Sequence, residues 1–281
     1  MKKLLFLLVV VTLSILGFSP SGALARQTTK EKDIQEVRHY VEKQMPILES
    51  ELKQLSKNSS LEEIEELISN HYKKHPAPKA LQNPELSVFN VFPDKVKKYK
   101  KFEGKSLNLN NLMNDPRSSS LGEMITFEND NSKVSVLLGE TGHINILENK
   151  KVSSPRPQKN KIALATGTER TTGIGYGLGG AKQFTVWAEG NFRYDGKKVS
   201  VISNDGDWVR HLFGSVFTYT PKGMGKVRDT SIGKYKYKEV YSRLLVETLA
   251  GFKWGNAVFG TKTVEVYVGS TVNGNIYGGT K

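Results

Sequence analysis

The sequence predicts an α+β protein, with a helical hairpin and a small antiparallel meander in its N-terminal part and an all-β sandwich in its C-terminal part. Three observations lead to this prediction. Apolar residues recur at helical spacing before Pro76, they alternate with a period of two from Met124 onward, and a polar, proline-containing segment separates two β-rich regions. We therefore expect four parts: a signal peptide (1–25), the hairpin with the meander (26–152), a linker (153–160) and a basic β-sandwich (161–281).

The first 25 residues have the pattern of a secretory signal peptide. A basic start at residues 1–3 precedes an apolar run at residues 4–16, and residues 23–25 provide an A-x-A cleavage site. The apolar run is ~13 residues long, whereas a helix that spans a bilayer of ~30 Å needs ~20 residues. We expect a secreted mature chain that begins at Arg26 and has no transmembrane span.

Cysteine is absent from the sequence. The chain therefore has no disulfide scaffold, no thiol nucleophile and no Cys-based metal site. A lipid-anchor cysteine and a hydrophobic C-terminal tail are also missing, so we expect a released product, of a kind common among Gram-positive bacteria.

The formal net charge is +13, and most of the excess lies in the C-terminal part. From Lys161 onward there are 17 Lys/Arg against 9 Asp/Glu. A basic surface outside a bacterium favours encounter with teichoic acid or anionic lipid of the envelope. The alternative is that the charge only keeps a secreted protein soluble.

Two helices are expected in the N-terminal part. Residues 31–54 have an apolar stripe, which Pro46 should kink or restart. Ser60 and Glu63 have the spacing of a capping box, so a second helix should begin there and end before Pro76.

Strands are expected from Met124 onward. A meander covers residues 125–127, 134–138 and 143–147. The Asp195-Gly196 dipeptide predicts a tight hairpin turn. The further strands that we expect are residues 184–188, 191–194, 197–202, 209–220, 234–241, 244–249 and 261–268.

A glycine-rich segment at residues 172–180 is the most unusual local pattern. In a strand, alternate glycines would leave one face without side chains, so a partner could approach the backbone closely. We expect this segment to engage a target, through Gly173, Gly175, Tyr176, Gly177 and Gly179. The alternative is an ordinary flexible loop.

A second pattern is basic. Three lysines alternate with tyrosines at residues 234–238, and three more cations precede them. These residues could bind an anionic surface, or the lysines could protect a sheet edge from aggregation. The set is Lys222, Lys226, Arg228, Lys234, Lys236 and Lys238.

Enzyme and metal motifs are weak. Neither H-E-x-x-H nor G-x-S-x-G occurs, so we expect no catalytic residues and no cofactor. His71 and His75 would share a helix face, but a helix C-terminus favours histidine in any case, so we expect no metal site. His211 suits a core or rim position, and residues 204–207 suit a turn better than a calcium loop. No specific nucleic-acid signature appears.

Glutamates on predicted strands leave a hydrolase open as a third possibility. Glycosidases use two carboxylates that flank the scissile bond. The candidates are Glu189, Glu247 and Glu265.

The chain resembles the large secreted bacteriocins of Gram-positive bacteria, of the geobacillin type. The resemblance lies in the signal peptide that begins with Lys2 and Lys3, the lack of cysteine, the glycine-rich segment and the basic C-terminal half. It implies a released antibacterial protein and assigns no role to any residue. The leading expectation is thus a secreted, non-enzymatic antibacterial protein, and the alternative is a cell-wall or matrix-binding structural protein without toxicity.

Overall fold

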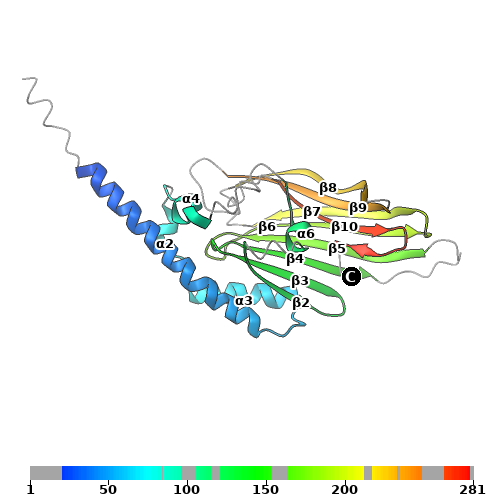
Figure 1. Cartoon of the computed structure of the whole chain (residues 1–281), viewed down its shortest axis with the longest axis horizontal. Helices are drawn as coiled ribbons and strands as arrows, with labels where there is room; N and C mark the ends of the chain where they lie inside the picture. Colours follow the sequence, from blue (N-terminus) through cyan, green and yellow to red (C-terminus); the bar gives the residue numbers. More distant parts are fainter. Residues whose placement is uncertain are drawn as a thin grey trace, which may run out of the picture.

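The computed structural model describes residues 21–83, 85–95, 106–114, 121–153, 164–211, 217–232, 235–248 and 263–278. Helices occupy the N-terminal part and two β-sheets make up most of the rest (Figure 1). The predicted N-terminal helices and β-rich remainder are confirmed at this level. The apolar run at residues 4–16 lies outside the described residues, and the predicted cleavage site at residues 23–25 lies within the first helix.

Helix α2 (Ser21–Gln54) is one continuous helix of 34 residues. Pro46 lies inside it, so the helix does not restart after the proline. The apolar stripe continues across the proline, because Val41 before it and Leu48 after it are both buried. Packing along the stripe therefore outweighs the one backbone hydrogen bond that proline removes.

Helix α3 (Leu61–Lys74) begins as the sequence predicts. The Glu63 backbone N–H donates to the Ser60 hydroxyl over 3.3 Å, and the Ser60 N–H donates to the Glu63 carboxylate over 2.7 Å. Satisfying two orphan donors in this way fixes the start of the helix. Among the described helices, none is both long and apolar enough to cross a membrane.

Short elements connect the helices to the sheets. They are η1 (Lys79–Gln82), α4 (Val88–Val91), β1 (Ser106–Asn108) and α6 (Leu109–Asn114).

The larger sheet has six antiparallel strands in sequence order. They are β2 (Gly122–Glu128), β3 (Ser132–Gly139), β4 (Ile144–Ser153), β5 (Leu164–Tyr176), β6 (Lys182–Tyr194) and β7 (Val199–Arg210). The predicted meander is β2–β4, and the predicted Asp195-Gly196 turn joins β6 to β7, with Gly196 at φ +84°. Because β4 pairs with β5, the predicted meander and the strands after the predicted linker share one sheet. Residues 154–160 of that linker lie outside the described residues.

The smaller sheet has five strands, with β1 parallel to β10 and the other pairs antiparallel. The strands not yet defined are β8 (Phe217–Ile232), β9 (Tyr235–Thr248), β10 (Thr263–Thr271) and β11 (Ile276–Tyr277). The predicted single strand at 209–220 is wrong, because β7 ends at Arg210 and β8 begins at Phe217 in the other sheet. The two strands predicted at 234–241 and 244–249 lie mostly in the single strand β9.

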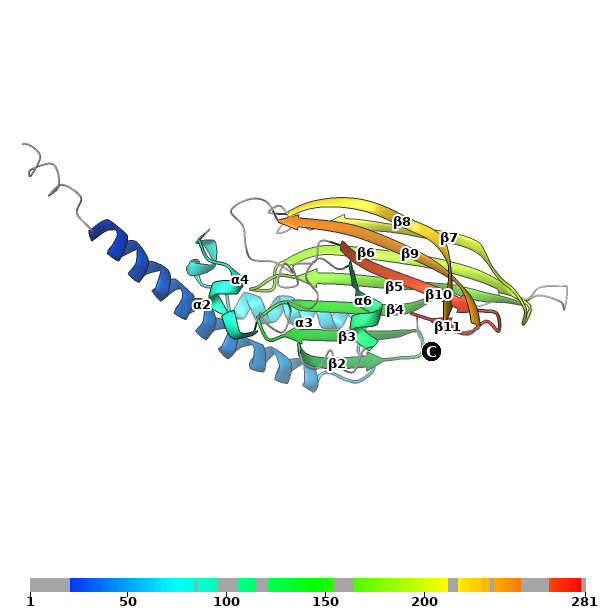
Figure 2. The ribbon, with the colours of Figure 1, turned by 45° about the horizontal axis from the view of Figure 1, so that its top comes forward.

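Two cores cover the two faces of the six-stranded sheet (Figure 2). One core lies between the sheets, where Val186 on β6 and Val266 on β10 are fully buried. The other lies between the sheet and the helices, where Leu52, Ile64 and Ile146 are fully buried. The six-stranded sheet is therefore the middle layer, with helices on one side and the smaller sheet on the other.

Glycines allow the two sheets to come close together. A Cβ atom on Gly173 would lie 2.5 Å from Leu109 Cδ1 and 2.8 Å from Val266 Cγ1. Nearby, the buried Ser242 hydroxyl of β9 accepts from the Gly225 N–H over 3.1 Å and donates to the Trp187 carbonyl over 2.6 Å. This hydroxyl links β8, β9 and β6, so side chains larger than glycine at the contact would separate the layers.

Replacing Gly173 tests this contact. Gly173→Ala should lower the free energy of unfolding by about 1–3 kcal/mol, because the new methyl group overpacks the core between the sheets. Urea unfolding measures the change. The matched control is Gly196→Asn, because a Cβ atom there meets nothing within 4 Å and Asn tolerates a positive φ. Equal stability of Gly173→Ala and the wild type would contradict the close approach.

Candidate functional site

The outer face of the five-stranded sheet carries an array of aromatic and charged side chains. Val240, Val264 and Val266 point into the core, so the residues that alternate with them point outward. We call this array the tyrosine–arginine face. It consists of Arg228, Tyr237, Glu239, Tyr241, Arg243, Glu265, Tyr267 and Tyr277.

Arg228 is the centre of this face. Its Nε donates to Glu239 over 2.5 Å and its Nη2 to Glu265 over 2.9 Å, and both carboxylates are buried. Its guanidinium lies 4.7 Å from the centroid of the Tyr241 ring. Arg243 pairs with Glu265 as well and stacks on the same ring. Two arginines thus neutralise two buried carboxylates.

Tyrosine rings pack against one another beside this network, one pair edge to face and one pair tilted. The Tyr277 ring lies 5.0 Å from Tyr237 and 6.0 Å from Tyr267, centroid to centroid. Burial raises the pKa of Tyr267 to about 12, and its hydroxyl donates to Asn111 over 3.1 Å. The rings are partly exposed, so this face offers flat apolar surface beside held charges.

The six predicted basic residues do not form one surface. Lys226 and Arg228 lie on the outer face of the sheet, opposite Tyr241 and Glu239, while Lys236 and Lys238 project from the other side of the same strands. Arg228 is held by the two buried carboxylates described above.

These basic residues also differ in whether an ion pair already neutralises them. Lys238 pairs with Asp229 over 2.5 Å, and Lys234 lies outside the described residues. Lys222, Lys226 and Lys236 are exposed, and none of them forms an ion pair within the part of the chain that the structure describes. Among the predicted basic residues that the structure describes, only these three keep a charge that a ligand could meet directly.

The predicted target-engaging segment is largely interior. Gly173, Gly175 and Tyr176 are buried in β5, which lies between β4 and β6, and Gly177 just beyond the strand is buried too. Gly179 lies in the following turn at φ +78° and is partly exposed. Other parts of the same chain occupy the space beside these glycines: Leu109 and Val266 at Gly173, and Gln183 at Gly177.

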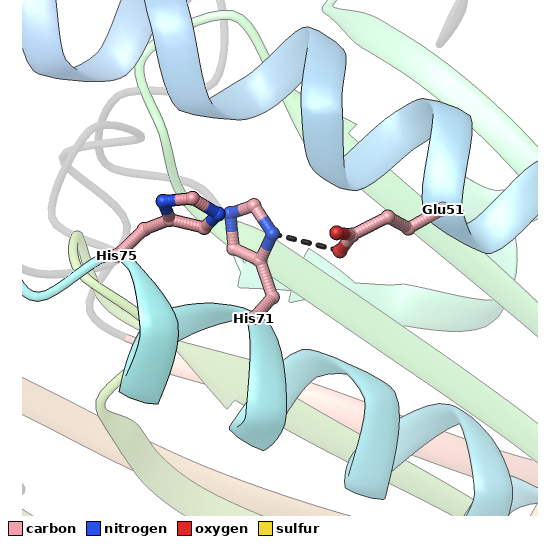
Figure 3. A group of neighbouring side chains, drawn as sticks. All are labelled: Glu51, His71 and His75. Atoms are coloured by element: carbon pink, nitrogen blue, oxygen red, sulfur yellow. Dashed lines mark hydrogen bonds and ion pairs between the residues drawn. The ribbon is translucent and has the colours of Figure 1, made fainter.

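A cluster of His71, His75 and Glu51 lies where α3 ends beside α2 (Figure 3). One potential ligand atom from each residue lies within 4.8 Å of the other two. His71 Nδ1 is 2.8 Å from the Glu51 carboxylate, and the His71 side chain is buried. Burial lowers the pKa of His71, and Glu51 partly opposes this change. The sequence showed the His spacing, but it gave no sign that Glu51, 20 residues earlier, lies beside it.

Two of the three glutamates predicted for a hydrolase, Glu189 and Glu265, do not form a pair. Glu189 binds Arg170 over 2.6 Å on the helix-side face of the six-stranded sheet, whereas Glu265 lies on the outer face of the other sheet. Both sheets and the core between them separate the two. The Glu247 side chain lies outside the described residues.

The structure also describes His211, for which we expect a core or rim position, and residues 204–207, for which we expect a turn. His211 follows β7 and its Nε2 lies 3.0 Å from the Thr185 hydroxyl, and burial lowers its pKa. The predicted turn at residues 204–207 is wrong, because these residues pair with residues 187–190 inside β7 and β6.

Glu169 is a buried acid that the sequence did not single out. It lies on β5 opposite Gly190 and is 5% exposed, and its Oε2 has no hydrogen-bond partner among the described residues. Burial raises its pKa to about 7, although Lys151 lowers it in part. Alternating sequence patterns do not distinguish such a position from an exposed one.

The chain matches no protein family, no curated protein and no solved structure. The geometry of its own residues therefore carries the functional argument.

Removing the central arginine should destabilise the fold. Arg228→Ala leaves Glu239 and Glu265 buried with less compensation, so we expect a loss of about 3–5 kcal/mol in unfolding free energy. Chemical denaturation measures it. The control is Lys226→Ala, two residues away on the same face but exposed, which should change stability by less than about 0.5 kcal/mol. Similar losses for both variants would refute the central role of Arg228.

Glu169 predicts a pH dependence. Its folded-state pKa is raised, so the folded chain binds more protons than the unfolded chain between about 4.5 and 7, and stability falls as the pH rises through that window. Glu169→Gln should therefore stabilise the protein by on the order of 2–3 kcal/mol at pH 7.5 and hardly at all at pH 4. Urea unfolding at both pH values checks this. A gain that is the same at both would contradict it.

Proposed function

We propose that the chain is a secreted, non-enzymatic antibacterial protein that binds phosphate-bearing groups in the envelope of target bacteria. The observation that carries this proposal is the charge of the tyrosine–arginine face. Its buried carboxylates are neutralised by Arg228 and Arg243, so the exposed Lys226 beside Tyr241 gives this side of the sheet a net positive charge, and the exposed Lys222 lies in the adjoining bulge of β8. We further propose that the two sheets form a β-sandwich whose outer side presents this face.

Lys226 lies directly beside the rings. It is opposite Tyr241 in the β8–β9 register, and a bulge at residues 221–226 brings Gly223 next to both side chains. A polymer with alternating phosphates and sugar or polyol units could place phosphates on the lysines and carbon–hydrogen surface on the tyrosines. This chemistry fits teichoic acid, and the phosphate headgroups of anionic lipid share the charged part of it.

The resemblance to large secreted bacteriocins and the signal-peptide pattern support an action on other bacteria. The alternative is a wall- or matrix-binding protein that uses the same face without toxicity. A carboxylate hydrolase has less support, because Glu189 and Glu265 lie on opposite faces of the layers.

Charge removal on the face tests the proposal. Each lysine near an anionic surface contributes about 1 kcal/mol, so Lys222→Gln with Lys226→Gln should weaken binding about 30-fold. Sedimentation with isolated Gram-positive walls measures the affinity, in low and high salt because screening should weaken it. Vesicles containing phosphatidylglycerol, used in parallel, distinguish lipid from polymer.

The matched control removes the same charge elsewhere. Lys197 and Lys198 are exposed on the β6–β7 turn, so Lys197→Gln with Lys198→Gln should bind nearly as the wild type does. Equal losses in both double variants would mean that net charge alone drives binding. A spot assay of the purified chain on Gram-positive bacteria then separates the two functions: growth inhibition that the first double variant lacks supports the antibacterial role, and wall binding without inhibition overturns it.

A further inference from the structure

We propose that His71 and His75 bind a divalent transition-metal ion, Zn²⁺ by its chemistry, and that Glu51 is a positioning residue that orients His71. The site joins the end of α3 to α2. It is independent of the envelope-binding proposal, because no residue of the tyrosine–arginine face takes part.

The hydrogen bond to Glu51 sets the tautomer of His71. A carboxylate can only accept, so the hydrogen of the neutral ring lies on Nδ1 and is donated over 2.8 Å to Glu51. The lone pair is then on Nε2. Metal-binding histidines commonly donate their other ring N–H to a carboxylate in this way, which holds the ring in place.

The His71 Nε2 atom has no partner among the described residues, although the side chain is 0% exposed. A buried acceptor without a donor destabilises a fold, because the hydrogen bond that it made to water in the unfolded chain is not replaced. Figure 3 shows this nitrogen turned away from Glu51 and toward the His75 ring, and the two ring centroids are 4.9 Å apart. A metal ion between the two rings would satisfy the orphan lone pair.

Two hydrogen bonds hold the backbone of His75 in place. The His75 N–H donates to the His71 carbonyl over 2.9 Å, and the Tyr40 hydroxyl of α2 donates to the His75 carbonyl over 2.8 Å. Helix α2 therefore holds the ring of His71 through Glu51 and the backbone of His75 through Tyr40. Rotation of the partly exposed His75 ring is the movement needed to close the site.

The type of ligand atom determines which metal ions the site prefers. Two imidazole nitrogens suit Zn²⁺, Cu²⁺ or Ni²⁺, whereas Ca²⁺ and Mg²⁺ prefer oxygen ligands. A groove of about 520 Å³ beside His71 is lined by Glu51, Glu63 and Glu66 as well as Lys74, so its charge favours cations. Water would complete the coordination of an ion held by two nitrogens.

Zinc titration of the full chain tests the proposal. After treatment with a chelator, calorimetry should show one Zn²⁺ per chain, and Ca²⁺ should not compete. His75→Ala and Glu51→Gln should each lower Zn²⁺ affinity about 10–100-fold, the first by removing a ligand and the second by releasing the His71 ring. The matched control is His39→Ala, an exposed histidine on α2, which should bind as the wild type does.

Two further measurements distinguish Zn²⁺ bound at this site from Zn²⁺ bound elsewhere on the chain. Zn²⁺ should raise the melting temperature of the wild type and of His39→Ala but not of His75→Ala, because a ligand bound only to the folded state stabilises it. The ¹⁵N resonance of His71 Nε2 should shift on titration while Nδ1 keeps its proton. No binding to the wild type, or equal binding to His75→Ala and His39→Ala, would overturn the proposal.

Discussion

The two sheets can approach each other closely because glycine occupies the positions where they meet. At Gly173 the space of a side chain is taken by Leu109 and Val266, and at Gly225 it is taken by the backbone of Asp205 and Gly206 in β7. Sheets packed this tightly leave no room for a charged side chain at the centre of the contact. Glu239, Arg243 and Glu265 therefore project outward, where Arg228 and Arg243 gather the buried carboxylates into one network.

The six-stranded sheet is covered on both faces, and the two covering layers carry different functional groups. On one side the smaller sheet presents lysines and tyrosines around a neutralised core of ion pairs. On the other side α2 and α3 bring two imidazoles and a carboxylate together. Because β5 contributes to both cores through alternate residues, the glycine-rich segment that looked most like a ligand-binding element is the element that holds the layers together.

Local signals in the sequence predicted local structure well. The Ser60 capping box, the Asp195-Gly196 turn and the period-two meander all form as expected, since a few neighbouring residues determine each of them. Predictions that depended on distant partners did not hold as well. Helix α2 continues through Pro46 because of packing that the residues next to the proline do not predict. Arg228 looked like a free cation in the sequence, because its carboxylate partners lie on β9 and β10.

The parallel pairing of β1 with β10 has a consequence for how the chain folds. Asn108 donates to Glu265 across 157 positions of sequence, and Asn110 bonds the backbone of Tyr267 and Gly278. Contacts between residues so far apart in sequence form slowly, because the intervening chain must first lose conformational entropy. During synthesis, β1 and α6 have no partner strand until the last strands emerge. The core between the two sheets therefore cannot be completed until the last strands have emerged, and a chain truncated before β10 would expose apolar surface that the whole chain covers.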